Sequence, residues 1–106
     1  MAKNKIIIAN HKMNMLSSDI NIYLKKIKEQ INIENVIICP SCIYIPYFLK
    51  QNFKVGIQNI FYKSKGAYTG EISPRQAKSM EVDYAIVGHS ERRKYFLETN
   101  NEINQK

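Results

Sequence analysis

The sequence predicts an α/β protein in which short parallel strands alternate with helices. Four apolar, mostly β-branched runs read as buried strands, at residues 5–9, 36–39, 53–57 and 84–88. Segments with helical spacing or helix-start signals follow each of them, and each strand ends in polar residues. Such alternation implies parallel strands with right-handed crossovers, and helices that cover the sheet.

The helices are predicted from apolar spacing and from start signals. In the first, apolar residues recur on one face at Ile20, Tyr23, Leu24, Ile27 and Ile31, and the helix runs to about Gln30. Its N-cap candidates are Ser17, Ser18 and Asp19. A second helix is predicted over residues 43–50 with Pro46 near its start, a third from Ser73-Pro74 to about Met80, and a last segment from Ser90 or Glu91. The long polar loop at 62–70 predicts a functional or interface element.

Composition indicates one soluble domain of residues 1–106. The net charge of +7 comes from scattered lysines, without a basic stripe or a nucleic-acid-binding motif, so we expect no nucleic-acid partner. No apolar run approaches the roughly 18 residues of a membrane span. The start of the chain, residues 1–5, precedes too short an apolar run for a signal peptide, so a cytoplasmic location is expected.

The two cysteines form Cys39-Pro40-Ser41-Cys42 after the second strand. A C-x-x-C in this position is where a redox motif would lie, and a redox role would require a lowered thiol pKa. A zinc site would need two further ligands, and the sequence has neither a second C-x-x-C nor paired histidines, so no metal is expected. Two incidental thiols are the favoured interpretation, with a redox protein as the alternative.

Polar residues at the carboxyl ends of the strands should share one rim, because all strand-to-helix loops of a parallel sheet lie at one edge. These residues are Asn10, Lys12, Gln58, Asn59, His89 and Glu91. Lys12 is placed to neutralise a phosphate or a developing oxyanion, although a solvent-exposed lysine is the alternative. His89 is an acid, a base or a donor, or else a histidine satisfied within a turn.

The helix that starts after His89 disfavours the imidazolium form, so a neutral ring could donate to a substrate carbonyl. Arg92 is predicted to make a structural ion pair, with Glu98 or Glu71 holding its guanidinium bidentately.

Three motifs resemble the triosephosphate isomerase family in order and spacing. They are Asn10-His11-Lys12-Met13-Asn14 after the first strand, Gly66-Ala67-Tyr68-Thr69-Gly70-Glu71-Ile72-Ser73 in the long loop, and Val87-Gly88-His89-Ser90-Glu91-Arg92-Arg93 after the fourth strand. The similarity runs from Lys5 to Lys106, and implies about half of an eight-stranded TIM barrel. His11 replaces the family's usual aromatic residue, and Met15 stands where glycine is common. Both departures are expected to alter packing at a dimer contact.

The resemblance implies a homodimeric enzyme of glycolysis and gluconeogenesis that interconverts dihydroxyacetone phosphate and glyceraldehyde 3-phosphate without a cofactor. It assigns His89 as electrophile, Lys12 as electrostatic group, Glu91 as the carboxylate near the lysine, and Asn10 with Lys12 as substrate-binding residues. It places Met13, Thr69, Gly70 and Glu71 at the dimer interface.

The same resemblance limits what these residues alone can do. A complete barrel needs about 250 residues. The family's general base, its lid loop and its glycine-rich phosphate loops have no counterpart here, and Glu71, Glu91 and Glu98 match other positions. We therefore expect the polypeptide alone to be essentially inactive. The alternative is a non-catalytic half-barrel that pairs with itself or with a C-terminal half.

Overall fold

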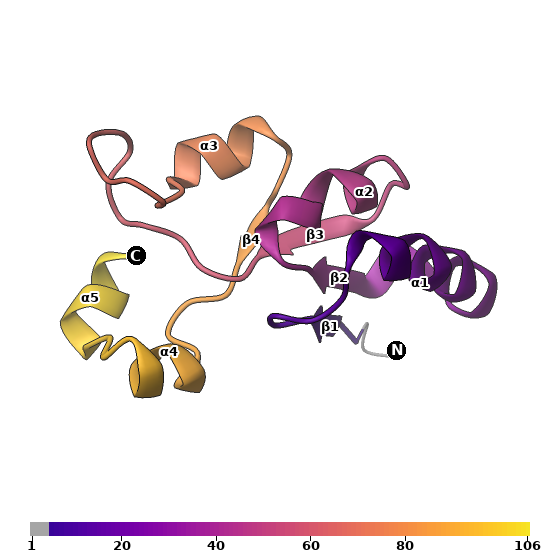
Figure 1. The fold of residues 1–106 in the computed structure, drawn as a ribbon, viewed down its shortest axis with the longest axis horizontal. Coiled ribbons are helices and arrows are strands. Elements are labelled where there is room, and N and C mark those ends of the chain that lie inside the picture. Colours follow the sequence, from indigo (N-terminus) through magenta and orange to yellow (C-terminus); the bar gives the residue numbers. More distant parts are fainter. Residues whose placement is uncertain (1–4) are drawn as a thin grey trace.

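The computed structural model describes residues 5–106, in which helices alternate with parallel strands (Figure 1). Most of the segment used above to exclude a signal peptide, residues 1–4, lies outside the described residues. The elements are β1 (Ile7–Asn10), α1 (Ser17–Gln30), η1 (Ile33–Asn35), β2 (Val36–Cys39), η2 (Cys42–Tyr44), α2 (Ile45–Leu49), β3 (Lys54–Ile57), α3 (Pro74–Ser79), β4 (Tyr84–Ala85), α4 (Ser90–Tyr95) and α5 (Asn100–Gln105), where η denotes a 3-10 turn.

Within the described residues the strands form one four-stranded sheet in the order β1-β2-β3-β4. All three pairings are parallel, with Ile7 opposite Val36, Ile37 opposite Lys54 and Gly56 opposite Tyr84. The predicted α/β class is therefore confirmed. Because every strand runs the same way, the loops after β1, β2, β3 and β4 reach the same edge of the sheet.

The core lies between the central strands and the helices that cover one face of the sheet. Ile20 and Leu24 of α1 and Phe48 of α2 are buried there against Ile38 and Val55. All four residues of β2 are buried, as expected of a strand with neighbours on both sides. The helical spacing of α1 thus predicted its C-terminal end and most of its buried face, although Ile31 is the C-cap and is 45% exposed.

The prediction that the first strand is buried on both faces is wrong. Ile7 and Ile8 of β1 are 60% and 59% exposed. β1 lies at one edge of the sheet and pairs only with β2, so its other side has no neighbour among the described residues. Periodicity predicts a strand here, but burial depends on what lies next to it.

The fourth strand is also shorter and more exposed than predicted. Only Tyr84–Ala85 form β4, at the opposite edge of the sheet, although the Ile86 N–H still donates to the Ile57 carbonyl at 2.9 Å. Tyr84 and Val87 are 43% and 40% exposed. The predicted fourth strand is therefore present but ends earlier, and its predicted burial is wrong for the same reason as in β1.

Helix ends follow local chemistry, with one correction at α1. Its N-cap is Leu16, not Ser17, Ser18 or Asp19, and the Asp19 carboxylate accepts from the Leu16 N–H at 2.9 Å. Ser73 caps α3 as predicted.

Two other predicted helices are divided. The segment 43–50 is a 3-10 turn followed by the short α2, with Pro46 in its first turn. The C-terminal segment is split into α4 and α5 by Leu97, which has a φ of +56°. No helix within residues 5–106 is long and apolar enough to cross a membrane.

Candidate active site

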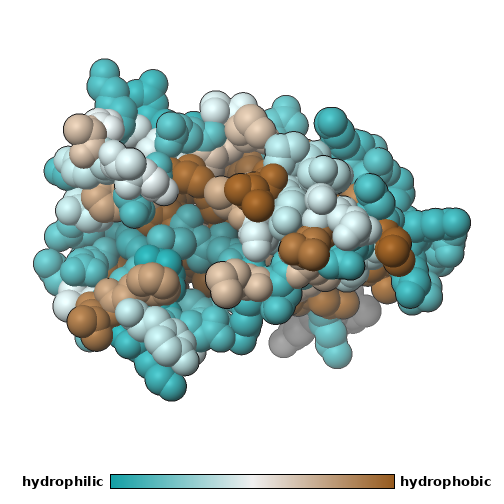
Figure 2. Space-filling model, viewed as in Figure 1, coloured by the Kyte–Doolittle hydropathy of each residue, from teal (hydrophilic) through white to brown (hydrophobic). Residues whose placement is uncertain are grey.

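An open cleft of about 600 Å³ lies at the carboxyl ends of the strands. In Figure 2 the molecule is hollowed between α3 and the α4–α5 pair, where hydrophilic residues gather. The six residues predicted to share one rim all line this cleft: Asn10, Lys12, Gln58, Asn59, His89 and Glu91. Their placement agrees with the sequence, while their chemical roles remain predictions.

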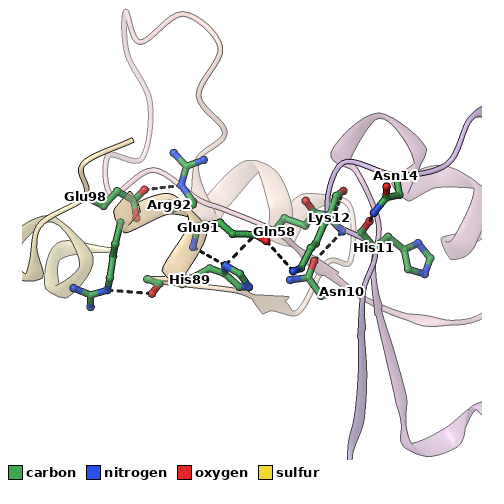
Figure 3. Close-up of polar contacts among 11 residues, drawn as sticks. Asn10, His11, Lys12, Asn14, Gln58, His89, Glu91, Arg92 and Glu98 are labelled. Carbon is green, nitrogen blue, oxygen red and sulfur yellow. Dashed lines mark hydrogen bonds and ion pairs between the residues drawn. The ribbon is translucent and has the colours of Figure 1, made fainter. Parts of the chain in front are cut away.

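Lys12 and Glu91 join the two edges of the sheet across the cleft. The loops after β1 and β4 start three strand spacings apart, about 14 Å on a flat sheet. The Lys12 Nζ nevertheless donates to Glu91 Oε1 at 2.8 Å (Figure 3). The hydrogen bond from Lys12 lowers the pKa of the Glu91 carboxyl. Both side chains are about half exposed, so this pair orients Lys12 toward the cleft more than it stabilises the fold.

The backbone of Lys12 is held in an unusual conformation. Its φ of +55° lies in the left-handed region, which is uncommon for residues other than glycine. The Lys12 N–H donates to Asn10 Oδ1 at 3.0 Å, and its carbonyl accepts from Ser41 Oγ at 3.0 Å and Gln58 Nε2 at 2.8 Å. The neighbouring Asn10 and the loops after β2 and β3 therefore fix the peptide that carries the lysine. The roles of Ser41 and Gln58 were not predicted, although Gln58 follows a strand at the correct edge.

His89 is the N-cap of α4, and this placement fixes its ring. The Glu91 N–H donates to His89 Nδ1 at 3.1 Å. Nδ1 must therefore be unprotonated, and a neutral ring carries its proton on Nε2. With Nδ1 accepting this bond, Nε2 is the ring nitrogen of His89 that can donate to the cleft.

Of the two partners predicted for Arg92, Glu98 and Glu71, the structure shows Glu98. Its Nε donates to Glu98 Oε2 at 2.6 Å, and Lys106 Nζ donates to the same oxygen at 2.6 Å. The predicted bidentate contact is wrong, because Oε1 is buried without a partner. Burial works to raise the pKa of Glu98, but the bonds from Lys106 and Arg92 outweigh it and the net pKa is lowered.

The cysteine pair does not have the features of a redox site. Cys39 is buried, Cys42 is exposed, and both are free. Burial raises the pKa of the Cys39 thiol, which is opposite to what a reactive thiol needs. Within residues 5–106 no group of three or more His, Cys, Asp or Glu side chains could hold a metal ion.

The residues predicted for a dimer interface are all exposed. Met13 is 94% exposed, and Thr69, Gly70 and Glu71 lie on the surface of the long loop. Met13, Gly70 and Glu71 also line the cleft. Their role in an interface stays a prediction.

The two departures in the first loop have different structural settings. Met15 has a φ of +72°, a conformation that favours glycine, so the side chain stands at a strained position. His11 points into the core of its own chain and is 8% exposed.

Known proteins match this amino-acid sequence along nearly the whole chain. The family model for triosephosphate isomerase matches residues 5–106. The triosephosphate isomerase of Dictyoglomus turgidum is 41% identical over 111 residues, which cover 98% of this chain and 45% of that protein. That of Clostridium botulinum strain Loch Maree is 39% identical over 110 residues, covering 98% and 44%. That of Clostridium perfringens strain SM101 is 47% identical over 75 residues, covering 67% and 30%.

The chain therefore spans less than half the length of the first two relatives and matches their N-terminal portion. Its four parallel β/α units are those of a partial TIM barrel. With a family model matched over residues 5–106, this chain belongs to the triosephosphate isomerase family.

Proposed function

We propose that this chain supplies the electrophilic half of a triosephosphate isomerase active site. The reaction is the interconversion of dihydroxyacetone phosphate and D-glyceraldehyde 3-phosphate through an enediolate, in glycolysis and gluconeogenesis. The observation that carries the proposal is the Lys12–Glu91 bond at 2.8 Å beside a His89 ring whose Nδ1 is occupied. It puts a cation and a ring N–H donor on one cleft.

Each residue has a distinct task in this proposal. Lys12 Nζ offsets the negative charge of the substrate phosphate and of the enediolate, with Glu91 holding the ammonium in place. Asn10 helps to hold the substrate, its Oδ1 being fixed by the Lys12 N–H. His89 Nε2–H polarises the substrate carbonyl and passes its proton between the two enediolate oxygens. No cofactor takes part.

A base that removes the carbon-bound proton is also required, and the carboxylates on the cleft do not provide it. Glu91 is paired with Lys12, and Glu71 belongs to the long loop. Losing one acid or base group typically costs about 10²- to 10⁴-fold in rate. We propose that a polypeptide of these 106 residues is essentially inactive by itself, and that the base lies in the remainder of the barrel.

The proposed enzyme acts on a small phosphorylated triose in the cytoplasm. It functions as a homodimer in which Met13, Thr69, Gly70 and Glu71 contact the partner. The exposure of the long loop supports this role, because these side chains have few contacts within their own chain.

A chimera tests the catalytic proposal. Residues 1–106 are fused to the remaining C-terminal portion of the Dictyoglomus turgidum relative, and isomerase turnover is measured beside that of the 106-residue chain. The chimera should be active, and Lys12→Met or His89→Gln should lower kcat/KM by about 10²-fold or more.

Lys78→Met is the matched control, because Lys78 also forms an exposed pair, with Asp83 at 2.6 Å, away from the cleft. A folded chimera without turnover would refute the proposed function. Turnover by the 106-residue chain alone would refute its proposed inactivity.

The second candidate is a non-catalytic half-barrel assembly module. The observation that favours it is the exposure of apolar side chains at both edges of the sheet, Ile7 and Ile8 on β1 and Tyr84 and Val87 near β4. Exposed edge strands carry unpaired backbone groups that recruit further strands. Sedimentation velocity, with and without the C-terminal portion of a relative, tests this. A stable monomer that ignores that portion would exclude the module.

A further inference from the structure

His11 is buried in the segment that carries Asn10 and Lys12. Its ring packs edge-on against Tyr23 of α1, with centroids 4.8 Å apart, and against Phe48 of α2 at 5.6 Å. The backbone of His11 is held as well. Its backbone N–H donates to the Cys39 carbonyl of β2 at 3.0 Å, and its backbone carbonyl accepts from Asn14 Nδ2 at 3.1 Å. One residue thus ties the segment to β2, α1 and α2.

The ring has one polar partner and one bare nitrogen. Nε2 lies 3.1 Å from the Tyr23 hydroxyl, while Nδ1 is buried without a partner among the described residues. If Nδ1 carried the proton, a donor would be buried and unpaired, which costs about 1–3 kcal/mol. The favoured neutral form therefore has its proton on Nε2, which donates to Tyr23, and leaves only an acceptor lone pair at Nδ1.

A second proton, at Nδ1, would create a buried imidazolium with no acceptor for its new N–H and no anion beside it. The groups that face the ring are the Tyr23 hydroxyl from α1 and the apolar Phe48 ring from α2, whereas Cys39 of β2 contacts only the His11 backbone N–H, through its carbonyl. Within the segment, the Lys12 ammonium is already bound to Glu91. No carboxylate in residues 5–106 pairs with the His11 ring, and burial lowers the pKa of this histidine.

The segment also contains backbone strain that its contacts must hold. Lys12 and Met15 both have positive φ values, +55° and +72°. Such conformations cost of order 1–3 kcal/mol each and persist only where surrounding contacts impose them. Release of the His11 ring would remove the inward anchor next to Lys12, and would let these two residues relax.

We propose that His11 is a positioning residue whose neutral ring latches residues 10–14 to α1 and α2, and that protonation at Nδ1 releases the segment together with Lys12. Its importance for catalysis rests on the proposed function, whereas acid release of the segment does not. Because the ring is harder to protonate in the folded state than in the released one, the latch is complete above the ordinary histidine pKa of about 6.5 and weakens below it.

The test combines ring titration with amide exchange in the full chain. His11 and His89 are the two histidines, so His89→Gln assigns the His11 resonances directly. Ring shifts are followed by NMR from pH 8 to pH 4.5, together with protection factors of the His11 and Lys12 amides, which donate to the Cys39 carbonyl and to Asn10 Oδ1. Protection should fall by up to about tenfold for each pH unit between the two pKa values of His11.

His11→Phe keeps an aromatic ring against Tyr23 and Phe48 but cannot be protonated, so its segment should stay protected at acid pH. Tyr23→Phe removes only the hydrogen-bond partner, and should lower protection already at neutral pH while leaving an acid transition. Amides of β2 serve as the internal reference for global unfolding.

Constant protection of the segment through the His11 titration would overturn the latch, as would an unchanged acid transition in His11→Phe. In an active chimera, the acid limb of kcat/KM should move with the same substitution. An active chimera with no release refutes the latch alone, whereas release in an inactive chimera refutes the proposed function alone.

Discussion

Single residues in this chain are constrained where backbone and side chains approach most closely. Lys12 illustrates this, because its N–H and its carbonyl are each satisfied by neighbouring side chains despite the positive φ. Gly56 is a second case, since a Cβ added there would lie 2.6 Å from Cys39 Sγ on the adjacent strand. Both positions lie near the carboxyl ends of strands, from which the loops of the cleft start.

Gly56→Ala should destabilise the chain by about 1–3 kcal/mol, the usual cost of overpacking a buried site. The urea midpoint of unfolding measures this, with Cys39→Ala as the partner change that removes the sulfur. In the Cys39→Ala background the alanine at 56 should cost clearly less. Equal costs in both backgrounds would show that the contact with Cys39 is not the cause.

The placement of the cleft residues could be predicted because it depends only on the parallel direction of the strands. Once the strands are parallel, Asn10, Lys12 and His89 must reach one rim. What holds Lys12 in place could not be predicted, because the contacts of Ser41 and Gln58 with its carbonyl join residues 29 and 46 positions away. Nor does any local pattern show that His11 turns inward toward Tyr23.

At the scale of elements, local chemistry determines helix ends better than strand burial. α3 has a complete capping box, in which Ser73 Oγ accepts from the Gln76 N–H at 3.1 Å and Gln76 Oε1 accepts from the Ser73 N–H at 2.9 Å. Both bonds lie within four residues, so the sequence contains the whole signal. The capping of α1 by Leu16 and Asp19 lacks a side-chain acceptor at the cap, and was missed.

Ser73→Ala should therefore cost about 1 kcal/mol, because it removes the cap of α3. Ser17→Ala is the matched control, since Ser17 is exposed and makes no capping bond in α1. Its effect should stay within about 0.5 kcal/mol. Chemical denaturation of both variants measures this, and a loss for Ser17→Ala as large as that for Ser73→Ala would support the N-cap predicted from sequence for α1.

The C-terminal elements depend on the buried carboxylate of Glu98, which links Arg92 of α4 to Lys106 beyond α5. Its lowered pKa means that the stabilisation is present above the unfolded pKa of about 4.3 and is lost as the pH falls through the folded value. Glu98→Gln should cost about 1–3 kcal/mol at pH 7, because it removes the charge that pairs with the partly exposed Arg92 and the buried Lys106.

The pH dependence separates this from a simple packing effect. The difference in free energy of unfolding between Glu98→Gln and the unaltered chain should shrink on acidification below pH 4. Asp83→Asn breaks the exposed pair with Lys78 and serves as control, with little expected effect at any pH. A difference that stays constant from pH 7 to pH 3 would argue against the ion pairs.

At the scale of the whole molecule, the sheet has a well-packed centre and two open edges. β2 is fully buried, while the side chains of β1 and of residues 84–87 are substantially exposed. This pattern is what a barrel looks like when four of its strands are considered alone. It also explains why burial of the edge strands was mispredicted. The apolar side chains of β1 and β4 suit a closed barrel, in which further strands would lie beside them, and residues 5–106 do not contain those strands.

These edges should make the 106-residue chain self-associate, and one substitution should suppress it. Ile8→Asp places a charge on the edge strand β1, where Ile8 is 59% exposed, and charges on an edge oppose strand pairing. Ile22 on α1 is 58% exposed and far from an edge, so Ile22→Asp is matched in residue type, exposure and charge. Sedimentation should show association in the unaltered chain and in Ile22→Asp but less in Ile8→Asp. Equal behaviour of the two variants would mean that general surface apolarity, and not the β1 edge, drives the association.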